Sequence, residues 1–93
     1  MSHDTLSATL TERGSRYGLF LHHAEVTQTL KATIRQQLAA REKTLSFDQV
    51  EALEMICHKI GRIVNGDPDY ADSWVDIAGY AKLVADRLNG ITR

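Results

Sequence analysis

The sequence predicts an all-α fold, and three observations carry this prediction. Apolar residues recur at the helical spacing of three and four positions through long stretches of the chain. The only proline is Pro68, so no long stretch is interrupted. No segment shows the strict alternation typical of a strand. With 93 residues, of which 43% are hydrophobic, we expect a single domain, a small helical bundle.

The N-terminal segment, residues 1–18, is polar, and we expect a short helix in it from Asp4 to Glu12. The segment from Arg13 to Gly18 follows, and it contains two glycines, two arginines and a tyrosine. Glycine permits close backbone approach, and arginine offers a planar fork for phosphate. On its own the segment is typical of a surface turn between helices.

The first long helix is expected over residues 19–41. This stretch contains neither glycine nor proline, and its apolar positions follow the helical period: Val26, Leu30, Ile34 and Leu38.

A second helix is expected over residues 46–65, and its start carries the clearest local signal in the chain. Ser46 and Gln49 match a capping box, and Leu45 with Val50 matches the hydrophobic staple. The helix should end at Asn65-Gly66, with Gly66 in the left-handed conformation that terminates helices.

The third long helix is expected over residues 70–89, after Pro68 has blocked continuation of the second. Asp67, Asp69 or Asp72 could cap its start, and Asn89-Gly90 ends it. Its core stripe is predicted to comprise Trp74, Ile77, Ala78, Ala81, Val84, Ala85 and Leu88. We expect the two C-terminal helices to lie antiparallel, with the first long helix packed across them.

The opposite stripe of that third helix predicts self-association. It carries Tyr80 and Leu83 beside Gly79, among the charged residues Asp72, Asp76 and Arg87. A helix that is apolar on one side and half-apolar on the other usually has a second partner. We therefore expect a homo-oligomer, an oligomeric bundle in which these second faces meet or line a cleft.

Charge and composition exclude several classes of partner. The net charge is −1 and the isoelectric point is near 6.4, so neither a DNA or RNA polymer nor an anionic membrane is attracted. The single cysteine, Cys57, excludes an internal disulfide and fits a reducing compartment. The chain has no apolar run of membrane-spanning length, and we expect a cytoplasmic protein.

The turn between the second and third helices predicts a phosphate site. Lys59, Arg62 and Asn65 precede it, and aspartates follow it. Together with the first segment, the candidate ligand-binding residues are Arg13, Arg16, Tyr17, Lys59, Arg62, Asn65 and Tyr80. Arginine and lysine would hold phosphate, while Tyr17 or Tyr80 would stack on a base. The same turn would equally suit a salt-bridged helical hairpin without a ligand.

Two pairs of acids are candidate ligands for Mg²⁺. Glu51 and Glu54 lie one turn apart on the second helix, and Asp72 and Asp76 lie one turn apart on the third. Hard divalent cations take carboxylate oxygens, and Mg²⁺ also neutralises polyphosphate. Acids at this spacing are also common on exposed helices.

The chain resembles a family of short phage and prophage proteins of unknown function. The resembling pieces are E-R-G-S-R-Y-G, A-L-E-M-I-C-H-K-I-G-R-I, N-G-D-P and D-S-W-V-D-I-A-G-Y-A. More distantly, the two C-terminal helices are similar to the all-α nucleoside triphosphate pyrophosphohydrolases of the MazG type, which carry E-x-x-E and E-x-x-D. Glu51, Glu54 and Asp76 match that pattern, but Ser73 stands in place of its remaining glutamate, beside Asp72.

These resemblances imply three functional hypotheses. The first is a phage-type protein of the bacterial host cytoplasm that sequesters a nucleotide or nucleotide-derived immune signal, including cyclic ones, in an oligomeric cleft. The second is a Mg²⁺-dependent pyrophosphohydrolase. The third is a helical adaptor for another protein. The missing glutamate favours binding over catalysis, so no catalytic residue is assigned.

Overall fold

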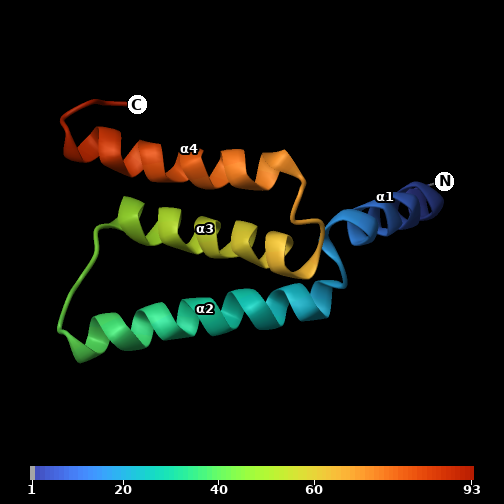
Figure 1. The fold of residues 1–93 in the computed structure, drawn as a ribbon, viewed down its shortest axis with the longest axis horizontal. Coiled ribbons are helices and arrows are strands. Elements are labelled where there is room, and N and C mark those ends of the chain that lie inside the picture. Colours follow the sequence, from blue (N-terminus) through green and yellow to red (C-terminus); the bar gives the residue numbers. More distant parts are fainter. Residues whose placement is uncertain (1) are drawn as a thin grey trace.

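The computed structural model describes residues 2–93 and confirms an all-α fold. Over these residues the chain forms four helices and no strand: α1 (Ser2–Tyr17), α2 (Phe20–Ala40), α3 (Phe47–Asn65) and α4 (Ala71–Leu88). Helices α2, α3 and α4 lie side by side, and α1 projects beyond one end of them (Figure 1). None of the described helices has the combination of length and apolarity that crossing a bilayer requires.

Helix α3 forms the centre of a single layer of helices. It packs against α2 on one side and α4 on the other, and its neighbours run antiparallel to it (Figure 1). Helices α2 and α4 make no contact with each other. The expectation that the first long helix crosses both C-terminal helices is therefore wrong. A single layer has two open faces, and among the described hydrophobic residues only Ala52 and Cys57 are buried.

The start of α3 has the predicted capping box. Ser46 is the N-cap, and its backbone N–H donates to the Gln49 side chain at 2.9 Å. The Arg87 guanidinium joins this end to the end of α4, donating to both Asp48 carboxylate oxygens at 2.7 and 2.8 Å. These hydrogen bonds hold the pKa of Asp48 well below its usual range. The ion pair between Arg87 and Asp48 thus links α3 and α4 at the end of the hairpin opposite their connecting turn.

The N-terminal segment differs from the expectation of a short helix followed by a turn. Helix α1 continues through Arg13, Gly14 and Arg16 and ends at Tyr17. The turn consists of Gly18 and Leu19, and Gly18 adopts a positive φ of 79°. A glycine inside a helix costs about 1 kcal/mol relative to alanine. The helix persists because its C-terminal carbonyls find partners in the rest of the molecule, as described below.

Two expectations for the α3–α4 turn are wrong. Gly66 has φ −125°, so it is not left-handed. The glycine is required by proximity instead, because a Cβ atom there would lie 2.1 Å from the Arg16 carbonyl oxygen. No aspartate caps α4, whose N-cap is Tyr70. The Asp67 carboxylate accepts from the Asp69 backbone N–H, and Asp72 accepts from the Tyr70 hydroxyl.

The predicted inward and outward stripes of α4 are reversed at several positions. Ser73 is 3% exposed, whereas Trp74 is 54% exposed and its indole N–H donates to the Pro68 carbonyl. Asp76 and Arg87, which were placed on the outward stripe, form ion pairs with α3. With these two residues turned towards α3, part of the most apolar stripe of α4 faces solvent.

Replacing Gly66 with alanine tests the close approach of α1. The added methyl group meets backbone, which cannot move aside as a side chain would, so Gly66→Ala should lower the free energy of unfolding by about 1–3 kcal/mol. Gly79→Ala is the matched control, because open space surrounds Gly79 in α4, and it should raise stability by about 0.5–1 kcal/mol. Urea unfolding of both variants measures the difference, and equal effects would contradict this explanation.

Candidate anion-binding site

A set of hydrogen bonds attaches the end of α1 to the end of α3. The Asn65 side-chain amide donates to the carbonyl oxygens of Tyr17 and Leu19, both at 2.9 Å. The Asp67 backbone N–H donates to the Arg16 carbonyl at 2.6 Å. The terminal carbonyls of α1, those of Arg16 and Tyr17, have no partner within the helix, so two of these bonds satisfy them and fix its position. Asn65, predicted as a ligand residue, is thus a structural residue.

Aromatic rings and guanidinium groups alternate at this junction. The Arg62 guanidinium lies over the Tyr17 ring, 4.3 Å from its centroid, and Arg16 lies over the Tyr70 ring at 4.7 Å. The two tyrosine rings meet edge to face, with centroids 6.3 Å apart. We call this arrangement the Arg–Tyr stack. Such cation–π contacts contribute about 0.5–1 kcal/mol each at exposed sites, and they hold the arginines in place.

The Arg–Tyr stack borders a hollow of about 320 Å³ in the angle between α1 and the end of α3. Its lining contains four predicted ligand residues, Arg13, Arg16, Tyr17 and Arg62, together with Thr9 and Glu12. We call it the basic hollow, since its cations outnumber its single acid. Arg16 lies 3.8 Å from Glu12, whereas Arg13 forms no hydrogen bond or ion pair with another described residue. The hollow therefore offers guanidinium donors to an anion.

Lys59 and Tyr80, also predicted as ligand residues, lie elsewhere. The Lys59 ammonium is buried and pairs with the Asp76 carboxylate at 3.0 Å, so it faces α4 rather than the hollow. Tyr80 lines a separate shallow depression on α4 with Val75, Asp76, Gly79 and Leu83. Neither residue is part of the lining of the basic hollow.

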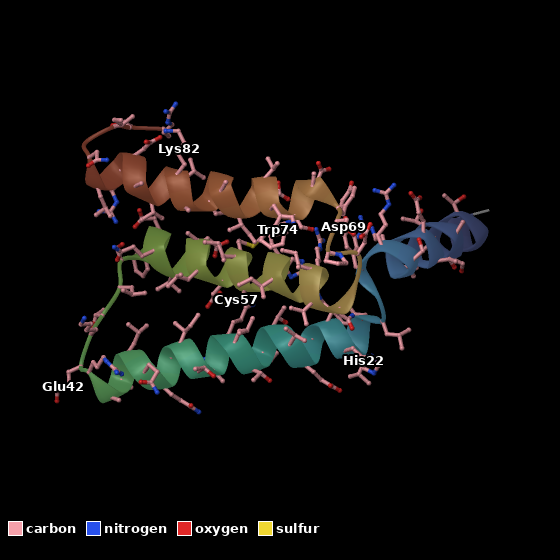
Figure 2. The ribbon with its side chains drawn as sticks, in the orientation of Figure 1. His22, Glu42, Cys57, Asp69, Trp74 and Lys82 are labelled. Carbon is pink, nitrogen blue, oxygen red and sulfur yellow. The ribbon has the colours of Figure 1, made fainter. Side chains whose placement is uncertain are left out.

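The acids predicted to hold Mg²⁺ do not gather into one site. No group of three or more histidine, cysteine, aspartate or glutamate side chains among the described residues could hold a metal ion. Asp76 is paired with Lys59, and Asp72 accepts the Tyr70 hydroxyl. Glu54 borders an apolar cavity of about 270 Å³ between α2 and α3. Figure 2 shows Cys57, which also lines this cavity, between the same two helices.

A part-buried histidine pair between α2 and α3 is not predicted by the sequence. His23 of α2 and His58 of α3 approach to 3.2 Å between Nε2 and Nδ1, with rings edge to face. Burial, reinforced by the neighbouring Arg62 cation, lowers the pKa of His58 to about 4 and also lowers that of His23. The sequence signal was Gly61 within a helix, since a Cβ there would lie 2.9 Å from the His23 ring.

Comparison with known proteins identifies a family without assigning a function. Residues 3–88 match a family, DUF6378, that is described as a domain of unknown function. No curated protein and no solved structure matches the chain.

The ion pair between Lys59 and Asp76 predicts a loss of stability when the Asp76 carboxylate is removed. Asp76→Asn leaves the buried Lys59 ammonium without a counter-charge and should lower the free energy of unfolding by about 1–3 kcal/mol. This is less than for a fully buried pair, because the Asp76 side chain is 45% exposed. Adding Lys59→Met should restore most of the loss. Urea unfolding of the single and double variants checks this, and an unchanged midpoint in Asp76→Asn would refute it.

The histidine pair predicts acid sensitivity. A histidine whose pKa is lowered on folding binds protons more strongly in the unfolded chain, so stability falls as pH drops from about 6.5 towards 4. We expect the melting temperature to decline between pH 7 and pH 5. His58→Gln, which cannot take up a proton, should show a shallower decline. Identical slopes for the two proteins would exclude His58 as the cause.

Proposed function

We propose that this chain, which belongs to the DUF6378 family, binds a nucleotide or a nucleotide-derived anion in the basic hollow. One observation carries the proposal: the fold brings Arg13, Arg16 and Arg62, which are up to 49 residues apart in the sequence, to one hollow with Tyr17. Guanidinium groups are planar forks that match phosphate oxygens, and charge-assisted hydrogen bonds of this kind are the strong ones.

The contacts around the arginines support phosphate as the group that is bound. Arg62 and Arg16 rest on tyrosine faces, so their orientation is set before a ligand arrives, which lowers the entropy lost on binding. Arg13 has no protein partner among the described residues and remains available. A hollow of about 320 Å³ has room for a mononucleotide-sized ligand rather than a polymer.

Two features favour a nucleotide as the phosphate compound that binds: the tyrosine at the hollow and the resemblance of the chain to phage proteins. Tyr17 borders the hollow, and aromatic faces stack on bases whatever their identity. The phage-type motifs support a role in sequestering nucleotide signals, cyclic ones included, within an assembly of identical chains. Hydrolysis of the MazG type has less support, because Asp76 is neutralised by Lys59 and the acids are dispersed.

Binding to ATP, a cyclic dinucleotide and inorganic pyrophosphate, each with and without Mg²⁺, tests the proposal by calorimetry. Arg62→Ala and Arg13→Ala should each weaken binding by about 1.5–3 kcal/mol, since each removes a charge-assisted contact. Arg62→Lys should also bind more weakly, because an ammonium does not replace a fork.

Arg35→Ala is the matched control, since it removes an equal charge from α2, away from the basic hollow. It should bind as tightly as the unmodified chain. Equal losses in Arg35→Ala and Arg13→Ala would reduce the effect to net charge. Absence of binding by all three probes at millimolar concentration would overturn the proposal, and release of pyrophosphate from ATP only with Mg²⁺ would favour hydrolysis instead.

A further inference from the structure

One open face of the α2–α3–α4 layer is apolar. On α3, Gly61 faces α2 and Lys59 faces α4, as their contacts with His23 and Asp76 show. The helical period of 3.6 residues leaves two open sides between these directions. Ile56 and Ile60 fall on one of them, and Arg62 falls on the opposite one.

The neighbouring helices add apolar residues to the same face. On α4 the side directed at α3 carries Ser73 and Asp76, and Trp74, Ala81 and Leu88 lie away from it. Helices α4 and α2 run antiparallel to α3 (Figure 1). Viewed along α3, their side chains therefore progress around the helix axis in the opposite direction, and the helical period places their apolar stripes on the face that carries Ile60. The resulting apolar face contains no aspartate, glutamate, lysine or arginine: Val26, Leu30, Ile56, Ile60, Ile63, Trp74, Ile77, Ala81 and Leu88.

A single chain exposes more surface than a folded monomer of its mass is expected to expose. One chain exposes 6896 Å². A folded monomer of 10.4 kDa is expected to expose about 5,400 Å², so the excess is roughly 1,500 Å². A standard protein interface buries about 800 Å² of each partner. The excess is therefore large enough for a stable interface, even after allowing for the projecting helix α1.

We propose that this apolar face packs against the same face of a second copy, forming a two-layer dimer. A face without formal charges meets its own copy without like-charge repulsion, and a twofold interface requires such self-complementarity. Arg62 and the basic hollow lie away from this face, so the dimer presents two accessible hollows. This interface replaces the one expected around Tyr80, since that side of α4 is partly occupied by the ion pairs with α3. The inference does not depend on the ligand.

Light scattering of the full chain at 50 µM tests the dimer. The expected mass is twice the chain mass of 10.4 kDa. Ala81→Glu should give the single-chain mass with its helical circular dichroism retained, because Ala81 is exposed in one chain and its charge would be buried only in the dimer. Ala39→Glu places the same charge on an exposed position of α2 outside the face, and it should remain dimeric.

A second measurement needs no variant. Trp74 is the only tryptophan and is 54% exposed in a single chain, so dilution should increase its quenching by acrylamide as dimers dissociate. A single-chain mass for the unmodified protein, an unchanged mass in Ala81→Glu, or quenching independent of concentration would each overturn the proposal. Loss of nucleotide binding in the arginine variants leaves these readings unaffected, so the two proposals fail separately.

Discussion

The hydrogen bonds that the Asn65 amide donates to the carbonyls of Tyr17 and Leu19 hold the end of α1 against the end of α3, and with it the arginines of the basic hollow. Helix α1 contacts the rest of the molecule only near its own end, so its direction depends on a few backbone carbonyls that must find partners. Asn65 and the Asp67 backbone N–H supply the donors, and Gly66, which has no side chain, lets the two backbones approach. With that junction fixed, Tyr17 meets Arg62, and the arginines of α1 face the end of α3.

The features that the sequence predicts correctly are those decided by neighbours in the chain. Ser46 and Gln49 are three residues apart and form their capping box without help from the rest of the fold. Asn89 and Gly90 end α4 for similar local reasons, with Gly90 at φ 82°. Three arginines and a tyrosine of the hollow could also be nominated, because guanidinium chemistry is a property of the residue type.

The features that it misses depend on partners distant in the chain. Nothing in the sequence around Lys59 indicates that this residue of α3 pairs with Asp76 of the adjacent helix α4. The helical period of Trp74 predicts a core position, yet Asp76 and Arg87 face α3 and Trp74 is exposed. His23 and His58 lie 35 residues apart, and their contact depends on the register of α2 along α3. In α4 the ion-paired residues face α3, and apolar surface is left outward.

The junction at Asn65 is also open to a slow chemical change, the deamidation of its asparagine. Asparagine followed by glycine is the sequence in which the backbone nitrogen most readily attacks the side-chain carbonyl carbon, expelling ammonia and closing a cyclic imide, which water then opens to a carboxylate. Here the Gly66 N–H donates a hydrogen bond to the Arg62 carbonyl, which restrains that nitrogen while the chain is folded. Once the reaction occurs, an amide that donated to two carbonyls becomes an acid that repels both. Loss of the Asn65 amide would therefore weaken the attachment of α1 to the end of α3 and displace its arginines from the hollow.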